Sequence, residues 1–401
     1  MLSEAARPYI QASVPVLREH GLAITSTFYK NMFSAHPELK NLFNMGNQAQ
    51  GVQQQSLAAA VFAYAANIDD LTVLAPVVSR IVHKHASLGI SAKHYPIVGH
   101  FLLGAIKETL GEAATEPLLD AWAEAYGMLA DALIAEEQRL YSAAGVKEGE
   151  LREVTVTQIT QQSENIKSYT LTAANGKPLS PFQPGQYISV AVNFADGTRQ
   201  LRQYSMSDAP DQPYYRISVK REDAAGESPS GQVSNWIHDN VKLNDRLQVS
   251  QPFGDFTPDM TSTNAIVLIS AGVGITPMIS TLNQLAKSRP QHEVIFVHAA
   301  RSESHHSHTT DLDFAIKHMP NLKVVSFYEA IDTSASLPDY ALKGEVQFAH
   351  LPAWNLQETN VYLCGPTGFM KKQGKILLDA GVPKNKLHKE VFGPALLENL
   401  M

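Results

Sequence analysis

The hydrophobic period of the sequence changes once, near residue 150, and this change limits the possible folds most strongly. From Ser3 to Tyr141 apolar residues recur three and four positions apart, which is the period of amphipathic helices, and no run alternates as a strand does. From residue 151 the period is two, in short runs such as GQYISVAVNF that are separated by Gly, Pro, Asn and Asp. A single all-α or all-β domain is therefore excluded.

The pattern predicts three domains in a chain of 401 residues. The first, 1–145, is all-helical, and the short charged stretch AAGVKEGE at 143–150 is a plausible linker. Several short antiparallel strands at 151–258 predict a small β-barrel. Strands and helices alternate over 263–401, in an order that indicates a parallel α/β sheet with crossover helices.

Composition excludes several classes of protein. With 44% hydrophobic and 18% charged residues the chain has the composition of a soluble globular protein, and a net charge of -7 argues against a nucleic-acid partner. No apolar stretch approaches the roughly 18 residues of a membrane span, and no basic start followed by an apolar block marks a signal peptide. The single cysteine, Cys364, fits a reducing compartment, so we expect a cytoplasmic protein.

The stretch IVHKHASLG contains two histidines on different faces of a predicted helix. His85 shares a face with Ile81, Val82 and Leu88, whereas His83 lies among polar residues and is expected to face water. A neutral imidazole on an apolar helical face is the usual form of an axial haem ligand, although a hydrogen-bonded core histidine has the same pattern.

Two polar residues lie among apolar neighbours in the helical part. Gln53 shares a helical face with Leu57, Val61 and Tyr64, and an unpaired buried amide there would cost about 1 to 3 kcal/mol. Tyr29 is a phenol in an apolar segment, and its hydroxyl needs a partner. Both residues are candidates to contact a ligand, or else core residues that are satisfied within the protein.

The predicted barrel contains two candidate phosphate-binding motifs. Arg202, Tyr204 and Ser205 form an RxYS group at a strand end, and the planar fork of arginine matches phosphate oxygens. The run GQVS at 231–234 opens a predicted helix whose first amides could bind phosphate. By itself the RxYS group is weak evidence, so a plain structural barrel stays the alternative to a bound nucleotide at this point.

The predicted parallel sheet contains further candidates. Gly272 and Gly274 directly follow a strand, with Thr276 as the expected N-cap and Pro277 at the first helical position, so a phosphate could approach the backbone there. Arg301 and Ser302 follow a second strand and could meet a 2′-phosphate. Cys364 ends a later strand and is a further candidate for this site; the alternative is an inert buried thiol. For His305, His306 and His308 we expect a solvated loop and not a metal site.

In its order and spacing the helical set Tyr29, Phe43, Gln53, Leu57 and His85 resembles the globin domain of flavohaemoglobins, the bacterial and fungal nitric oxide dioxygenases. The barrel and α/β motifs resemble the ferredoxin reductase superfamily, and the resemblance covers essentially the whole chain. It implies an all-α globin domain (1–145), an antiparallel β-barrel FAD domain (151–258) and an α/β parallel-sheet NAD(P)-binding domain (263–401). Since no CxxCH motif is present, the haem b is expected to be noncovalent.

The resemblance also implies roles for residues of the helical domain. His85 would be the proximal ligand of the iron, and Phe43, Leu57 and Lys84 would lie at the haem, with a solvent-facing side chain as the alternative for Lys84. Tyr29 and Gln53 would lie on the distal side as catalytic residues. Tyr95 and Glu137 would hydrogen-bond the far nitrogen of His85 and make it a stronger electron donor. Helical periodicity by itself does not separate Glu137 from Glu136.

For the remaining two domains the resemblance implies three groups of cofactor-binding residues. The flavin would be held by Tyr187, Arg202, Gln203, Tyr204, Ser205, Gly231, Gln232, Val233 and Ser234. The nicotinamide nucleotide would be held by Gly272, Gly274, Ile275, Thr276, Pro277, Cys364 and Gly365. Glu390 and Phe392 would flank the flavin.

The function implied by the resemblance is nitric oxide dioxygenation. NADH or NADPH reduces FAD, FAD reduces haem b with single electrons, and the reduced haem with oxygen converts NO to nitrate. NO and O2 would be the small-molecule partners of a monomer, and the choice between NADH and NADPH stays open. Two alternatives remain at this point: a flavin haem reductase that acts mainly on ferric iron or quinones, and a globin-based gas sensor.

Overall fold

The computed structural model describes residues 2–224, 226, 229–331 and 338–393. It divides into two compact units. The helical unit comprises Met1–Leu151 and Ala191–Arg202, together with the C-terminal segment that begins at Gly393, and the sheet unit comprises Arg152–Val190 and Gln203–Phe392. The change of period near residue 150 therefore coincides with a change of unit.

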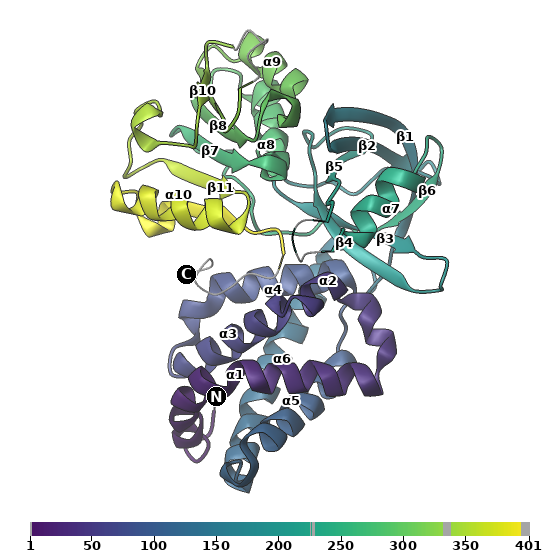
Figure 1. The fold of residues 1–401 in the computed structure, drawn as a ribbon, viewed down its shortest axis with the longest axis vertical. Helices are drawn as coiled ribbons and strands as arrows, with labels where there is room; N and C mark the ends of the chain where they lie inside the picture. The colour runs from purple at the N-terminus through teal and green to yellow at the C-terminus, as the bar shows by residue number, and fades with distance from the viewer. Residues whose placement is uncertain (1, 225, 227–228, 332–337, 394–401) are drawn as a thin grey trace. The chain divides into compact units, whose positions relative to one another are not determined.

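Helices form the first 144 residues, as the 3.6-residue period predicts (Figure 1). Helix α1 packs against α3, α5 and α6, and α4 packs against α6. The core between them contains Ile10, Phe28, Met32, Ile106 and Trp122, all almost completely buried. The helical elements, including short 3-10 turns (η), are α1 (Arg7–Ala35), η1 (Pro37–Leu42), α2 (Met45–Ala49), α3 (Val52–Ala66), η2 (Leu71–Leu74), α4 (Ala75–Leu88), α5 (His94–Leu110), η3 (Gly111–Ala113) and α6 (Glu116–Ala144).

The end of α4 contacts the segment that leaves the helical unit. Helix α4 ends at Gly89, whose φ of 78° is in the left-handed region that glycine adopts without strain. A Cβ atom on Gly89 would lie only 2.6 Å from the Cα of Gly149, so no other residue fits at this position. The segment between α6 and the first strand is thereby packed on the helix that contains His85.

An antiparallel sheet of six strands follows, in the order β4-β3-β6-β1-β2-β5. Strand β1 pairs with β2 and β6, and β2 pairs with β5. Inward-facing residues such as Val154, Leu171, Ile188 and Val219 are fully buried. The elements are β1 (Arg152–Ser163), β2 (Ile166–Ala173), β3 (Tyr187–Asn193), β4 (Arg199–Ser205), β5 (Tyr215–Lys220), α7 (Gln232–Asn240) and β6 (Arg246–Val249).

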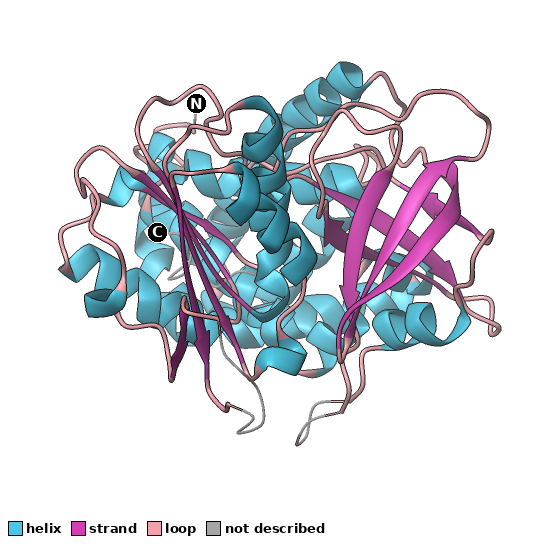
Figure 2. Ribbon diagram, turned by 90° about the horizontal axis from the view of Figure 1, so that it is seen from above, coloured by secondary structure: helices cyan, strands magenta, loops and turns pink. Residues whose placement is uncertain are grey.

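The last part of the chain forms a six-stranded sheet in the order β10-β9-β8-β7-β11-β12, parallel in all its pairings, and Figure 2 shows it nearly edge-on with helices on both sides. The chain progresses outward from β7 to β9 and later returns to the other side of β7 with β11, so the strand order reverses between these two strands. Ligands of open α/β sheets bind at the carboxyl ends of strands at such a reversal. The elements are β7 (Ile266–Ala271), η4 (Gly272–Gly274), α8 (Ile275–Ser288), β8 (Val294–Ala300), η5 (Glu303–His305), α9 (Thr309–His318), β9 (Leu322–Tyr328), β10 (Ala341–Lys343), η6 (Phe348–His350), β11 (Asn360–Cys364), α10 (Thr367–Asp379), η7 (Lys384–Lys386) and β12 (Leu387–Glu390).

The predicted fold classes are confirmed, with one shift in a helix start. Helix α8 begins at Ile275 after Gly274, so Thr276 is inside the helix and is not its N-cap, and Pro277 is the third and not the first helical residue. The Thr276 hydroxyl instead donates to the carbonyl oxygen of Val273, 3.0 Å away. No helix among the described residues is both long and apolar enough to cross a bilayer.

The expectation of a solvated loop at His305, His306 and His308 is wrong for His306 and His308, whereas the His305 side chain is 21% exposed. His306 and His308 are 3% and 0% exposed. The Nδ1 atom of His306 lies 2.7 Å from the hydroxyl of Tyr328, and both ring nitrogens of His308 have partners. In the described part of the chain no group of three or more His, Cys, Asp or Glu residues is placed to hold a metal ion. Three histidines within four residues look polar in sequence, and the burial of His306 and His308 follows only from the fold.

These buried histidines make stability depend on pH. Burial, with a smaller contribution from neighbouring His308, lowers the pKa of His306 to about 4, against about 6.5 in the unfolded chain. Between these pKa values the unfolded state binds more protons than the folded state. The contribution of His306 to the free energy of unfolding is therefore greatest above pH 6.5 and is lost as the pH falls toward 4. We expect a loss of roughly 3 kcal/mol from this group, measured by denaturant unfolding as a function of pH.

The control for this prediction is an exposed histidine on the following helix, α9. His306→Gln removes the titrating group and should flatten the pH dependence, whereas His318→Gln, at an exposed position of α9, should leave it unchanged. An identical slope in wild type and His306→Gln between pH 4 and 6.5 would contradict the assignment.

Candidate functional site

His85 is held in the helical unit by residues from two other helices. It lies in the last turn of α4, and its Nδ1 is 2.8 Å from Oε1 of Glu137 on α6 and 3.2 Å from the hydroxyl of Tyr95 on α5. Since Glu137 is an acceptor, the imidazole donates from Nδ1, which fixes the tautomer. Within the described part of the chain, both of these hydrogen bonds of His85 involve Nδ1, which leaves Nε2 for a metal ion.

The structure also distinguishes the two candidate acids on α6. Glu137 is 2% exposed, whereas Glu136 is at the surface and pairs with Arg139 at 2.8 Å. The Tyr95 hydroxyl donates to Glu137 as well. Burial and the adjacent Glu137 carboxylate raise the pKa of Tyr95, so the phenol keeps its proton and remains a donor. Glu137 thus accepts two hydrogen bonds, from His85 and from Tyr95.

Tyr29 is the centre of a second cluster in this unit. Its side chain is buried and hydrogen-bonds with Gln53, and the Gln48 side-chain amide lies close to the phenol. Burial raises the Tyr29 pKa to about 12, outweighing the two amides, so the hydroxyl keeps its proton. The Phe43 ring lies edge-on to Tyr29, with 5.7 Å between centroids. The predicted pair Tyr29 and Gln53 is therefore brought together.

Gln48 is a member of this cluster that sequence reasoning missed. It lies on α2, a helix of five residues whose start is capped by the Asn44 side chain. So short a segment has no hydrophobic period that could indicate a buried face. The amide nitrogen of Gln48 is buried without a hydrogen-bond partner among the described residues, which is the environment expected next to a polar ligand.

The remaining predicted residues of the helical unit lie as follows. Leu57 is partly buried and packs on the core. Lys84 does not simply point into solvent, because its Nζ donates to the carbonyl oxygen of Gly393 at 3.1 Å. His83 is half-buried, so the expectation that it faces water is only partly correct.

The RxYS residues all lie on β4, with Arg202 in the strand and Ser205 at its end. The Arg202 guanidinium donates to Oε1 of Gln200 and to the carbonyl oxygen of Leu201, at 3.0 and 2.7 Å. Gln203 donates to the Ser189 hydroxyl at 3.2 Å, and Ser205 is buried at the strand end. Strand β4 therefore presents a cation and a short polar strand end, both suited to a flavin nucleotide.

Two glycines, Gly254 and Gly231, lie beside residues that we expect to bind the flavin, at positions where a Cβ atom would be crowded. At Gly254 the φ is 119°, and a Cβ atom would lie 3.0 Å from the ring of Tyr187. Gly231 precedes α7, and a Cβ there would lie 2.7 Å from the Ser234 hydroxyl. Gln232 and Val233 form the first turn of α7, where backbone amides favour an anion. The residues present fit a flavin with a pyrophosphate.

At the strand reversal of the parallel sheet, the chain ends of β7 and β11 come into close contact. A Cβ on Gly274 would lie 2.5 Å from the carbonyl oxygen of Cys364, and one on Gly365 would lie 3.2 Å from the Cβ of Ala271. Glycine is therefore required at both positions. The packing brings Gly272, Gly274, Ile275, Thr276, Pro277, Cys364 and Gly365, the predicted nucleotide residues, to one edge of the sheet.

Cys364 is completely buried and is the register partner of Glu390 on β12. Burial, and secondarily the Glu390 carboxylate, raise the pKa of the Cys364 thiol well above its ordinary value, so it is neutral at physiological pH. Phe392 follows and is 45% exposed. Arg301 is exposed after β8, and the neighbouring Ser302 hydroxyl lies 2.8 Å from Nδ1 of His305.

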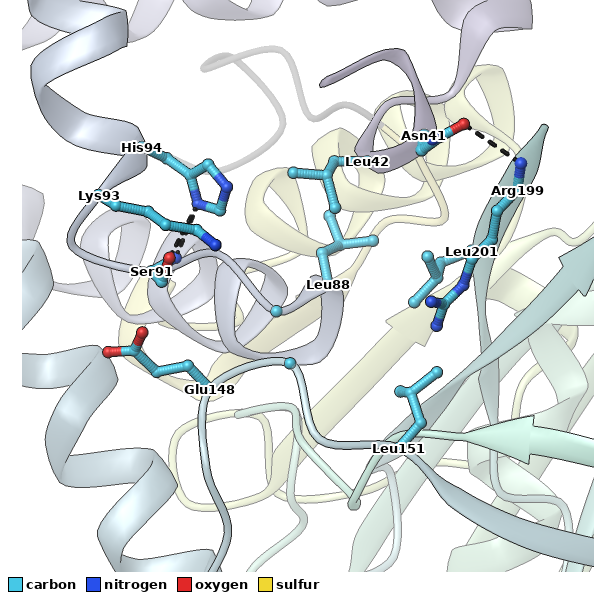
Figure 3. Close-up of a pocket in the computed structure, with 12 residues that line it drawn as sticks. Asn41, Leu42, Leu88, Ser91, Lys93, His94, Glu148, Leu151, Arg199 and Leu201 are labelled. Carbon is cyan, nitrogen blue, oxygen red and sulfur yellow. Dashed lines mark hydrogen bonds between the residues drawn. The ribbon is translucent and has the colours of Figure 1, made fainter. Parts of the chain in front are cut away.

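A cavity of about 400 Å³ lies in the helical unit at the end of α4 (Figure 3). None of the predicted site residues lines it. Dashed lines in the figure mark the 3.2 Å bond from the backbone amide of Arg199 to the Asn41 side chain and the contact between Ser91 and the His94 ring, which accepts from the Ser91 amide at 3.0 Å. Its lining combines Lys93, His94, Glu148 and Arg199 with Asn41, Leu42, Leu88, Gly89, Ser91, Gly149, Leu151 and Leu201.

Family models match each of the three parts of the chain. Residues 26–133 match the globin model, 153–257 match the oxidoreductase FAD-binding domain and 268–375 match the oxidoreductase NAD-binding domain. A flavohemoprotein of Rhizobium meliloti is 45% identical over 99% of both chains, and one of Chromobacterium violaceum is 48% identical over 98% of both.

A solved structure has the same fold over nearly the whole length. The flavohemoglobin of Malassezia yamatoensis, crystallised with bound FAD and heme, is 30% identical with a TM-score of 0.85, over 98% of this chain and 100% of that one. The flavohem-like FAD/NAD-binding domain of the nitric oxide dioxygenase of Vibrio cholerae is 37% identical over 61% of this chain and 99% of that one, with a TM-score of 0.55. The globin, FAD-binding and NAD-binding parts, in this order and over this length, show that the chain belongs to the flavohaemoprotein family.

Proposed function

We propose that the chain is an NAD(P)H- and O2-dependent nitric oxide dioxygenase that binds haem b, FAD and NADH or NADPH. The observation that carries the proposal is the hydrogen bond from His85 to the buried Glu137, in a chain that also has flavin and nucleotide domains. We further propose NO and O2 as its small-molecule partners, and a monomer in the cytoplasm. A lone, buried Cys364 is consistent with that reducing compartment.

The cofactors would supply the redox chemistry. Bound haem would supply iron at which O2 and NO combine to nitrate, and bound FAD would convert a two-electron hydride into the single electrons that iron accepts. His85 would hold the haem through Nε2. Its Nδ1 proton is held by Glu137, which makes the imidazole more basic, and Tyr95 keeps the carboxylate in place.

On the other side of the proposed haem site, Tyr29 would act as a hydrogen-bond donor. Its raised pKa keeps the hydroxyl protonated, and the Gln53 amide holds the phenol from one side. The unpartnered amide nitrogen of Gln48 provides a further donor. Donors held in a buried site stabilise developing negative charge because they need no reorganisation during the reaction.

In the sheet unit, the residues would position the nucleotide and the flavin and exclude water. Gly274 and Gly365 allow the strand ends of β7 and β11 to approach, so a nicotinamide could lie against the backbone there. The neutral Cys364 thiol adds no charge to this edge of the sheet, and Glu390 is beside it on β12.

The test of the proposal is anaerobic addition of NADH or NADPH to purified protein that contains both cofactors. We expect the flavin absorbance to bleach first and the haem spectrum to change to the reduced form afterwards, in one polypeptide. On admission of O2 and NO, NAD(P)H oxidation should depend on NO and nitrate should accumulate. A gas sensor would show no flavin reduction, and a ferric iron or quinone reductase would show no NO-dependent turnover; either result would overturn the proposal.

A second prediction concerns Tyr29 and Gln53. The double variant Tyr29→Phe, Gln53→Ala removes two proposed donors, so nitrate formation should fall on the order of 100-fold, by analogy with the loss of oxyanion donors. Flavin reduction by NAD(P)H should not change. Tyr64→Phe is the matched control, because this buried tyrosine donates to the backbone carbonyl of Ala125 and is not in the cluster. Unchanged nitrate formation in the double variant would refute the distal assignment.

A third prediction concerns electron donation by His85. Glu137→Gln replaces a charged acceptor by a neutral one, so the iron–histidine stretching frequency should fall. The haem midpoint potential should rise by roughly 60 mV, equivalent to a hydrogen bond worth about 1.4 kcal/mol. Resonance Raman spectroscopy and potentiometry measure the two quantities. Glu136→Gln, at the exposed neighbouring acid, is the control, and equal spectra for the two variants would contradict the role of Glu137.

A further inference from the structure

A buried carboxylate in the sheet unit joins the flavin-binding strand to the nucleotide-binding helix. Asp208 follows Ser205 by three residues and is only 9% exposed. Its carbonyl oxygen accepts a hydrogen bond from the Ser280 hydroxyl at 2.7 Å, and its Oδ1 accepts one from the Asn283 amide at 2.9 Å. Both Ser280 and Asn283 lie on α8. Tyr214 donates to Oδ2 of the same carboxylate at 3.0 Å.

A second carboxylate, Asp311 on α9, shares two of these partners. Asn283 also donates to Oδ1 of Asp311 at 2.8 Å. Arg216 on β5 lies 3.0 Å from Asp311 and 3.6 Å from Asp208. Burial raises the pKa of Asp311, but the bond from His308 and the charge of Arg216 outweigh it and hold the pKa at about 2. Both carboxylates are therefore connected through one arginine and one amide.

His308 links α9 to the antiparallel sheet through hydrogen bonds to both elements. It is fully buried, and its φ of 63° is unusual for a residue other than glycine. Its Nδ1 lies 2.8 Å from Asp311, and its Nε2 lies 2.9 Å from the Ser218 hydroxyl on β5. A backbone in this region persists only where surrounding contacts determine it, and such positions cluster at functional sites.

Stability alone is a weak explanation for this network. Burying two carboxylates and one guanidinium costs desolvation energy, and apolar residues of similar volume are often at least as stabilising. What the network does provide is directional contacts. Helix α8 begins at Ile275, directly after the Gly272–Gly274 loop, and Ser280 is one turn beyond Thr276. The bonds from Ser280 and Asn283 to Asp208 thus connect the nucleotide loop with the end of β4 through a few residues.

We propose that Asp208, Ser280 and Asn283 are positioning residues for hydride transfer, because they hold the Gly272–Gly274 loop and the first turn of α8 at a set place relative to the segment Gln203–Ser205. This inference rests on the proposed function. In the step concerned, the C–H bond at C4 of the dihydronicotinamide breaks and an N–H bond forms at N5 of the flavin; the nicotinamide is oxidised and the flavin is reduced by two electrons. The rate of such a step depends steeply on the placement of the two rings.

The experiment uses the full chain loaded with haem and FAD. The variants are Ser280→Ala, Asp208→Asn and Asn283→Ala, and the control is Thr281→Val. Thr281 is adjacent to Ser280 and equally buried, but its hydroxyl donates only within α8, to the carbonyl of Pro277. In anaerobic rapid mixing with NADH or NADPH, flavin bleaching should slow about tenfold or more in the three variants, and not in the control. Haem and FAD content should be unchanged.

A second readout requires no turnover. Amide hydrogen exchange of residues 271–279, measured without NAD(P)H, should be several-fold faster in the three variants than in wild type or Thr281→Val. If Asp208→Asn does not fold, Ser280→Ala, which removes a single hydroxyl, decides the question. Bleaching and exchange equal to those of Thr281→Val would overturn the positioning role. Absence of flavin reduction in wild type would instead refute the proposed function, and the exchange data would still decide whether the network positions the loop.

Discussion

The hydrogen bond between His85 and Glu137 is the constraint on which the helical unit depends. A buried carboxylate is costly unless it is paired, and here His85 and Tyr95 both donate to it. His85, Glu137 and Tyr95 come from α4, α6 and α5. The two hydrogen bonds that the Glu137 carboxylate accepts therefore hold these three helices together. The same bond orients the imidazole with Nε2 available, which makes the packing requirement and the proposed chemistry two consequences of one contact.

In the sheet unit, the corresponding constraint is close approach of backbones. Gly274 and Gly365 are glycines because the chain ends of β7 and β11 leave no room for a Cβ atom. This edge of the parallel sheet is also where the strand order reverses, and where the fold class places its ligands. The polar network of Asp208, Asp311 and Arg216 connects helices α8 and α9 to strand β5 of the antiparallel sheet.

The fold classes and many of the candidate residues could be predicted from the sequence, because they depend on local periodicity and short motifs. The period of 3.6 predicted the helices before residue 145, and the RxYS group and the glycines Gly272 and Gly274 marked strand ends that the structure confirms as β4 and β7. Gln48 could not be predicted, because its five-residue helix has no period, and the burial of His306 and His308 could not, because a polar run carries no sign of the elements that cover it. The choice between Glu136 and Glu137 needed the packing of α6 against α4 and α5.

By itself the sequence determined which segments are helices and strands, where the period changes, and which residue types are available for iron, flavin and phosphate. Those properties are set by neighbours within a few positions along the chain. Only the tertiary structure decided which of two adjacent acids meets His85, which amides surround Tyr29, and which histidines are hidden from water. Each of these depends on contacts between residues dozens of positions apart, for example 52 between His85 and Glu137, and such contacts exist only once the elements have packed.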